Sequence, residues 1–314
     1  MIDISIQNFE AELIQGSAKL PILLDIWAPW CGPCKTLGPE LEKLEIAYAG
    51  RFKLAKLNAD EQGEIAGQLS QMFGVRSIPF CVMFKDGQPV DGFVGAVPEA
   101  QIREFLDRHV PSAEEAAAEA EVEEAQELLA EGDAAAAFEK LREAVAIAPG
   151  NDAARYDYLR ALLSAGHVAE ARRAFDPVAD KVTLDPRLAA AGHWLSACDA
   201  ATSARSAEAL AAAISADRRD FAARFELAQT HFAAQRWTAA MDELLEIVMR
   251  DKAWNDEAAR KTYVAILELM SRSTKPKAEA SVVKATLEVA GKVINTASDP
   301  VVDQYRRKLS MALF

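Results

Sequence analysis

Apolar and polar positions in the first 110 residues follow the two periods expected of strands and helices. Residues 21–27 are apolar except for Asp25, which is typical of a buried strand, and the leucines of residues 37–44 then recur at helical spacing. Apolar runs at 52–58 and 80–84 predict two more strands. The remaining predicted elements are a helix capped by Asn8 and ending at Gly16, a helix over 65–73 closed by Gly74, a hairpin at Asp86-Gly87, and a last helix opened by Pro98.

The second half of the chain is helical in pattern and repeats itself with a shift of 34 residues, which is the tetratricopeptide period. A degenerate copy follows at 204–217, and another begins at Gln235. We therefore expect stacked helix pairs over residues 125–270, with a generic helical bundle as the alternative. The positions that match are Gly132, Ala137, Leu141 and Ala144 in one copy and Gly166, Ala171, Phe175 and Val178 in the next.

Composition and charge add a boundary and exclude some partners. From Ser112 to Glu131 the chain is mostly alanine and glutamate with no basic residue, so we expect an acidic linker over 111–124 that leads into a helix. The net charge of −13 argues against nucleic acid and anionic membrane surfaces as partners. No apolar run is long enough to span a bilayer, and the start of the chain carries no cationic segment, which predicts a cytoplasmic protein.

Candidate chemistry lies in Cys31-Gly32-Pro33-Cys34, directly after the strand at 21–27 and at the start of the following helix. The helix dipole and free backbone N–H groups there stabilise a thiolate, which makes Cys31 the attacking sulfur of a thiol–disulfide exchange site. The other interpretations are a zinc half-site and a structural disulfide. Zinc needs two more soft ligands, and the chain offers only isolated cysteines and scattered histidines, so no metal is expected. A structural bridge over so short a loop would add little loop-closure entropy.

These residues, and the order of elements over 1–110, resemble the thioredoxin family. The resemblance implies a thioredoxin fold with a redox-active Cys31–Cys34 disulfide and no other cofactor. It also implies that Asp25 accepts the proton of the resolving thiol, that Lys56 is its partner, and that the Ile78-Pro79 bond is cis and faces the cysteines. Burial of Asp25 within an apolar strand should by itself raise its pKa. The alternatives are a capping carboxylate for Asp25 and an ordinary loop proline for Pro79.

Substrate contacts are expected from the residues around the two sulfurs. Trp30, beside the nucleophile, is interpreted as part of an apolar rim, although it could be a core aromatic as Trp27 is expected to be. Cys81 is interpreted as a small core residue with no redox role. The residues predicted to bind substrate are Trp30, Gly32, Pro33 and Ile78.

A thioredoxin domain followed by tetratricopeptide units is similar to the chaperedoxin family (CnoX/YbbN), and the segments 255–269 and 299–314 strengthen the likeness. This resemblance implies a redox-active holdase that binds unfolded client proteins and passes them to the chaperonin GroEL and the DnaK system, with thioredoxin reductase as a further partner. Residues 271–298 depart from the family as an insertion. The alternatives are a disulfide reductase whose repeats bind one fixed partner, and an assembly scaffold with an incidental redox domain.

The C-terminal region, 271–314, ends in an amphipathic helix that Asp299-Pro300 begins. We expect this tail to dock a partner, and the partner expected is the chaperonin. The alternative is a helix that caps the last face of the repeat array. The residues predicted to dock are Tyr305, Arg306, Arg307, Leu309, Leu313 and Phe314.

Overall fold

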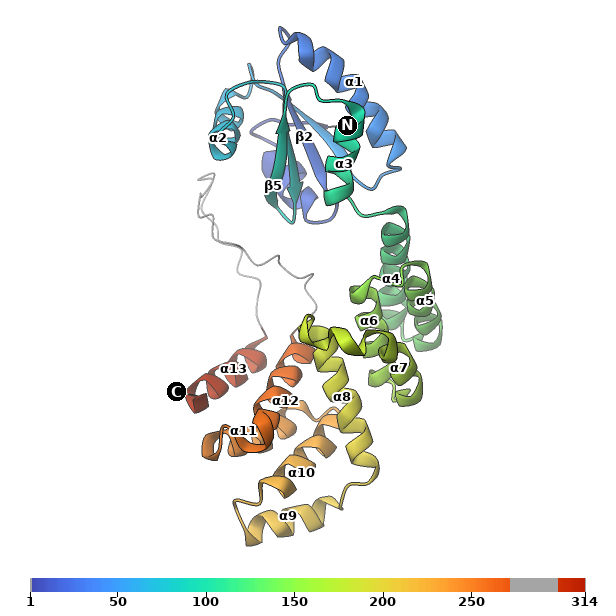
Figure 1. Ribbon diagram of the computed structural model, residues 1–314, viewed down its shortest axis with the longest axis vertical. Helices are drawn as coiled ribbons and strands as arrows, with labels where there is room; N and C mark the ends of the chain where they lie inside the picture. The colour runs from blue at the N-terminus through green and yellow to red at the C-terminus, as the bar shows by residue number, and fades with distance from the viewer. Residues whose placement is uncertain (1, 272–298, 314) are drawn as a thin grey trace. The chain divides into compact units, whose positions relative to one another are not determined.

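The computed structural model describes residues 2–271 and 299–313 of the chain (Figure 1). These residues form two compact units. The first comprises residues up to 116, and the second comprises residues 117–271 together with 299–313. Residues 272–298 of the predicted insertion (271–298) and the terminal Phe314 lie outside the described residues.

The first unit is built on a five-stranded sheet with the strand order β1-β3-β2-β4-β5. β3 is parallel to both β1 and β2, whereas β4 is antiparallel to β2 and to β5. The central strand β2 is almost wholly buried, as its apolar sequence predicts. The strands are β1 (Ile2–Asp3), β2 (Ile22–Trp27), β3 (Lys53–Asn58), β4 (Phe80–Lys85) and β5 (Gln88–Val94).

Helices cover both faces of this sheet. The leucines of α1 (Gly32–Ala47) and the apolar side of α3 (Glu99–His109) pack on one face. The helical segment η1 (Phe9–Gln15) and α2 (Gly63–Phe73) pack on the other, and Figure 1 shows α2 across the sheet from α1 and α3. The arrangement leaves the start of α1 just after β2, so the residues between them lie at the C-terminal end of the central strand.

Local signals explain where these elements end. Gly74 has φ 66° at the end of α2, a left-handed conformation that glycine adopts without a Cβ clash. Asp86 and Gly87 have φ 53° and 77° in the turn between β4 and β5, as the predicted hairpin requires. The prediction for Asn8 was wrong in detail. Its side chain makes no helix cap and instead accepts a hydrogen bond from the backbone N–H of Ser5 at 2.7 Å.

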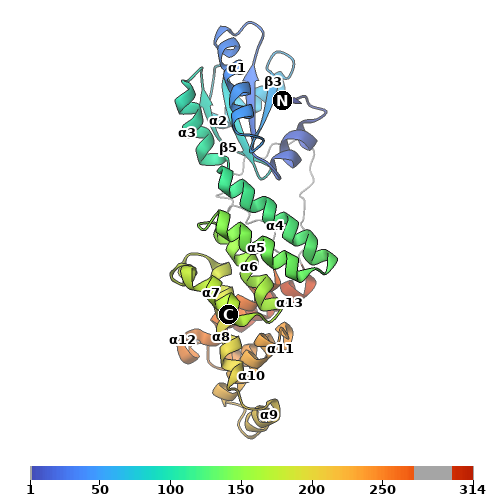
Figure 2. The same ribbon diagram turned by 90° about the vertical axis from the view of Figure 1, so that its right-hand side faces the viewer.

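The second unit is all-helical in its described part and has a large apolar core, with a separate small cluster between α9 and α10. Figure 2 shows its helices following one another along the chain. The helices are α4 (Ala113–Glu131), α5 (Ala134–Ile147), α6 (Asp152–Ser164), α7 (Val168–Phe175), the short η2 (Asp176–Thr183), α8 (Pro186–Thr202), α9 (Ala207–Ala216), α10 (Phe221–Ala233), α11 (Trp237–Arg250), α12 (Trp254–Met270) and α13 (Pro300–Leu313).

The repeated positions do what their sizes predict. Ala137 and Ala171 are completely buried, which lets neighbouring helices approach closely, and the glycines before them turn the chain with φ 91° at Gly132 and 81° at Gly166. Close approach is most evident at Gly192 of α8, where a Cβ would lie 2.8 Å from the ring of Phe175.

The acidic segment at 111–124 is not a linker, which corrects the sequence-based expectation. The chain is helical from Ala113, and Ala118 and Val122 are buried in the core of the helical unit. Lys140 of α5 bridges two glutamates of this helix, with its Nζ 2.9 Å from Glu121 and 2.8 Å from Glu124. Figure 2 shows α4 and α5 side by side. Small side chains and this cation let a sequence with few large apolar residues pack.

The C-terminal helix packs its apolar stripe against its own chain, as the alternative of a capping helix expects, while docking of a partner stays a prediction. The apolar stripe of α13, including Tyr305 and Leu309, is buried in the core of the second unit, and Leu313 packs against it. The Tyr263 hydroxyl donates to the Tyr305 carbonyl at 2.8 Å, and the Tyr305 hydroxyl donates to Asp242 at 3.0 Å. The stripe therefore packs on α11 and α12.

Two further findings concern the molecule as a whole. None of the helices within residues 2–271 and 299–313 is both long and apolar enough to cross a membrane. The chain folds as an α/β unit followed by a helical unit, as predicted.

Candidate active site

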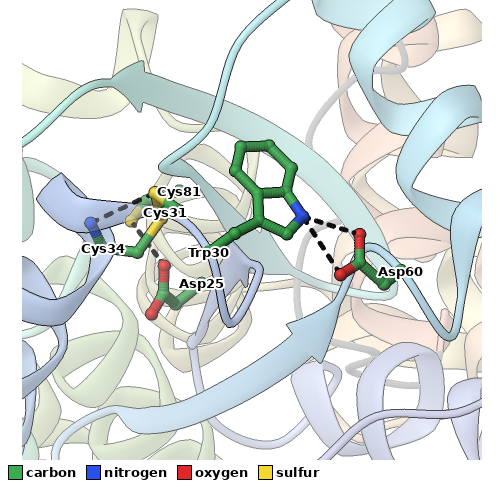
Figure 3. The surroundings of a disulfide bond; sticks show 6 residues. All are labelled: Asp25, Trp30, Cys31, Cys34, Asp60 and Cys81. Atoms are coloured by element: carbon green, nitrogen blue, oxygen red, sulfur yellow. Dashed lines mark hydrogen bonds between the residues drawn. A yellow bond between two sulfur atoms is a disulfide. The ribbon is translucent and has the colours of Figure 1, made fainter.

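The two cysteines lie at the N-terminus of α1 and are joined as a disulfide, with Cα atoms 5.3 Å apart (Figure 3). Cys31 is the N-cap residue of α1, and its Sγ accepts a hydrogen bond from the backbone N–H of Cys34 at 3.2 Å. Pro33 stands in the first turn, where its missing N–H is harmless. A thiolate formed at Cys31 on reduction would occupy an anion-stabilising position, as the sequence predicts.

Access to the sulfurs is narrow. Cys31 and Cys34 are each only 4% exposed, and they form an apolar cluster with Ala28, against which Trp27 and Ile78 pack. A substrate disulfide must therefore approach closely over the residues that surround them.

The buried carboxyl group of Asp25 lies in the middle of β2, and Figure 3 shows it near the disulfide. It is 1% exposed, and its register partners are Lys56 on β3 and Cys81 on β4. Burial raises the pKa of Asp25 to about 6, against the opposing effect of the Lys56 charge. The direction agrees with the sequence-based expectation. A carboxyl group with this pKa can exchange a proton near neutral pH.

Lys56 has a closer partner than the one predicted. Its Nζ lies 2.5 Å from Glu42 Oε1 on α1, and only 17% of its side chain is exposed. Lys56 acts on Asp25 through its charge, while Glu42 acts in the opposite direction and raises the pKa of Asp25. Sequence reasoning did not identify Glu42. The helical spacing of residues in α1 does not indicate which of its glutamates contacts a residue on β3.

The loop before β4 carries the predicted proline. The Ile78-Pro79 peptide bond is cis, as the resemblance implies, and Pro79 is buried. The Pro79 carbonyl accepts a hydrogen bond from the backbone N–H of Gly95 at 2.8 Å, which ties this loop to the end of β5. The neighbouring Ile78 packs against the disulfide cluster, so the structure brings this loop and the cysteines together.

Trp30 is 70% exposed, which supports its interpretation as part of the rim and not of the core. Its indole N–H is shared between both carboxylate oxygens of Asp60, each at 3.1 Å, and Figure 3 shows the ring extended between the disulfide and Asp60. Gly32 and Pro33 are also exposed. Asp60 was missed because it lies in a turn after β3 with no motif around it.

Cys81 has a neighbour that sequence reasoning did not foresee. Its Sγ lies 3.9 Å from Asp25 Oδ1, and both side chains are closed to solvent. Burial, more than the nearby Asp25, raises the pKa of the Cys81 thiol well above its usual value. The contact depends on the pairing register of β2 and β4, which no pattern along the chain reveals.

Comparison with known proteins agrees with this site. Residues 1–108 match the thioredoxin family, and residues 128–192 and 200–280 each match a tetratricopeptide repeat family. Thioredoxin 1 of Synechococcus elongatus is 42% identical over 103 residues, which is 33% of this chain and 91% of that protein. Thioredoxin 2 of Chlorobaculum tepidum is 47% identical over 104 residues, covering 33% of this chain and 90% of the relative.

The matched repeats and the thioredoxin match confirm the fold class that was predicted, an α/β thioredoxin fold followed by an all-α tetratricopeptide-like solenoid. The tail residues Tyr305, Arg306, Arg307, Leu309 and Leu313 belong to the second unit and not to this site. The first unit holds the matched motif, with its disulfide at the helix N-terminus and its buried aspartate. Through residues 1–108, this chain belongs to the thioredoxin family.

Proposed function

We propose that this chain is a redox-active chaperone that holds unfolding client proteins on its repeats and protects or reduces their cysteines at Cys31 and Cys34. One observation carries the redox half: a disulfide at a helix N-terminus, with the buried Asp25 carboxyl nearby and its pKa raised to about 6. The fused tetratricopeptide repeats and the resemblance to the chaperedoxin family support the chaperone half.

Exchange proceeds in two balanced steps. In the dithiol form, the Cys31 thiolate attacks a client disulfide; a Cys31–client bond forms and the other client sulfur leaves as a thiolate that takes up a proton. Cys34 then gives its proton to the Asp25 carboxylate, and its thiolate attacks Cys31 Sγ. The Cys31–Cys34 bond forms, the Cys31–client bond breaks, and the client sulfur leaves as a thiolate that takes up a proton. The client has gained the two electrons that the cysteine pair has lost.

Insulin reduction tests the redox step directly. Cys31→Ser should abolish turnover, because the attacking thiolate is gone. Cys34→Ser should accumulate a mixed disulfide that gel electrophoresis without reductant detects, because the second thiol that releases the client is missing. Wild-type turnover no faster than that of Cys31→Ser would disprove the redox assignment. We take thioredoxin reductase as the source of the reducing dithiol and the cytoplasm as the compartment.

Client binding has its own support. Several large apolar side chains of the second unit are exposed, among them Leu184 at 84% and Met249 at 50%. Such side chains can contact unfolded segments, which expose apolar surface of their own. The full chain with Cys31 and Cys34 both changed to Ser should still suppress the aggregation of several unrelated heat-unfolded proteins, measured by light scattering. If the variant bound a single folded protein and did not suppress aggregation, the alternative would be favoured: a disulfide reductase whose repeats bind one fixed partner.

Handover of clients to GroEL and to the DnaK system completes the proposal. The buried stripe of α13 does not serve this step, so the outward side of the helix is the surface we assign to it. Arg306 and Arg307 are exposed there, and Met311 is 74% exposed. Arg307→Glu combined with Met311→Gln should weaken co-purification with the chaperonin. The matched control is Tyr305→Phe, which alters the inward side of the same helix.

A further inference from the structure

Cys81 and Asp25 face each other across the central strand pair of the first unit. The two residues are register partners in the antiparallel pairing of β2 and β4. The Cys81 Sγ lies 3.9 Å from Asp25 Oδ1, and Figure 3 shows this contact beside the disulfide. Cys81 is 0% exposed and Asp25 is 1% exposed, so water does not compete for either group.

We propose that Cys81 is a positioning residue for proton transfer at this site, because its S–H donates a hydrogen bond to the Asp25 carboxylate and favours the ionised form that accepts the Cys34 proton. The proposal rests on the role assigned to Asp25 in the proposed function. It gives Cys81 no redox step of its own.

The donor role follows from the surroundings of the thiol. Burial raises the pKa of Cys81 well above its usual value, so the sulfur keeps its proton at neutral pH and remains a donor. In the described part of the chain, Cys81 is the side chain that hydrogen-bonds to Asp25. A carboxylate in a dry interior gains more from a donor than it would in water, because no solvent replaces the bond.

Two charged side chains also affect the ionisation of Asp25. Lys56 on β3 favours the ionised carboxylate, and Glu42 on α1 opposes it. These two side chains are paired with each other, so their effects on Asp25 partly cancel. Cys34 on α1 is held in the disulfide and does not titrate in this state. The thiol of Cys81 is thus a neutral group. Its removal should change the ionisation of the Asp25 carboxyl group without removing a charged side chain.

The test uses three variants of the full chain. Cys81→Val removes the donor and keeps the position apolar and closed, and Cys81→Ala is the substitute if valine is too large to fold. Cys81→Ser keeps a hydroxyl donor at the same place. Met83→Leu is the matched control, because Met83 packs in the same apolar cluster of β4 and makes no bond to Asp25. Two readouts are measured: the titration midpoint of the Asp25 carboxyl by carbon-13 NMR, and the acid limb of the pH profile for insulin reduction.

Loss of a weak donor should raise the Asp25 titration midpoint in Cys81→Val by about half a pH unit. The acid limb of insulin reduction should move to higher pH by the same amount, since the carboxylate form is required. Cys81→Ser should restore or lower both values, and Met83→Leu should leave both unchanged.

Equal NMR midpoints in wild type, Cys81→Val and Cys81→Ser would overturn the proposal and leave Cys81 as a packing residue. An equal upward shift in Cys81→Val and Met83→Leu would also overturn it, because repacking alone would then explain the change. The role of Asp25 is tested separately by Asp25→Asn. If that variant keeps the acid limb, the kinetic part of the proposed function fails, while the NMR midpoints still decide whether Cys81 controls the ionisation of Asp25.

Discussion

Replacing Asp25 with asparagine should stabilise the first unit above neutral pH. The pKa of the carboxyl group is raised from 3.8 to about 6 by burial. The folded chain therefore holds this proton in the pH range where the unfolded chain has already released it. The free energy of unfolding must then fall as pH rises from about 4 to 6, and remain low above that window.

The magnitude follows from the size of the shift. A shift from 3.8 to about 6 is roughly two pKa units, and each unit corresponds to about 1.4 kcal/mol, so the wild type should lose up to about 3 kcal/mol across this window. Asp25→Asn lacks the titrating group and should not show this loss. The gain is an upper value, because the buried amide also needs hydrogen-bond partners.

Hydrogen-exchange mass spectrometry of the oxidised full chain provides the assay. Peptides that cover β2 report the unfolding of the first unit alone, after correction for the intrinsic pH dependence of exchange. Asp60→Asn is the control, because it removes the same charge from an exposed position near the same site. If wild-type protection does not fall relative to Asp25→Asn between pH 4 and 7, Asp25 does not hold its proton as described. An equal effect of Asp60→Asn would assign the change to net charge instead.

Three other predictions concern the rim and the helical unit. Trp30→Ala should lower the catalytic efficiency of insulin reduction about tenfold, because an exposed aromatic anchor is lost. The reduction of a small aromatic disulfide by the same variant should change little. Equal losses on both substrates would contradict a rim role. Tyr305→Phe removes the hydrogen bond to Asp242 and should lower the free energy of unfolding of the second unit by about 1 kcal/mol, with insulin reduction unchanged; an unaltered calorimetric transition would mean that α13 is not a cap. Gly192→Ala should destabilise the same unit by about 1–3 kcal/mol, since its Cβ would lie 2.8 Å from Phe175, and a neutral result would show that the ring moves aside freely.

Much of the site followed from the order of residues along the chain. An ionisable side chain within an apolar strand predicted a raised pKa at Asp25, and the structure places that side chain at 1% exposure. A cysteine between a strand and a helix predicted an N-cap sulfur, and Cys31 is one. These features are local, because periodicity along a few residues determines both burial and helix start.

The contacts that tune the site did not follow from the sequence. The Cys81–Asp25 contact depends on strand register, and the pairing of Lys56 with Glu42 depends on how α1 lies across β3. Both are long-range relations that leave no periodic trace. For this reason Cys81 and Glu42, which have no motif around them, were not identified from the sequence as groups that affect the Asp25 carboxyl group.

Two segments of the helical part of the chain pack differently from what the sequence suggests, for different physical reasons. The apolar stripe of α13 predicts that this side of the helix is buried. The sequence does not show whether the surface that buries it belongs to the same chain or to a partner. The acidic run at 111–124 has few large apolar residues, yet Ala118 is completely buried. Small side chains bury little surface each but let helices lie close, so low hydrophobicity did not mean exposure.

The narrow access to the disulfide has a consequence for substrate choice. With each cysteine only 4% exposed, a partner sulfur reaches Cys31 only when it stands on a segment thin enough to lie over the rim. A disulfide in the interior of a rigid protein cannot present such a segment, whereas the same disulfide in a loosened chain can. We therefore expect the site to discriminate by the flexibility of the substrate more than by its residue sequence. On this expectation, a protein becomes a substrate when its own structure loosens.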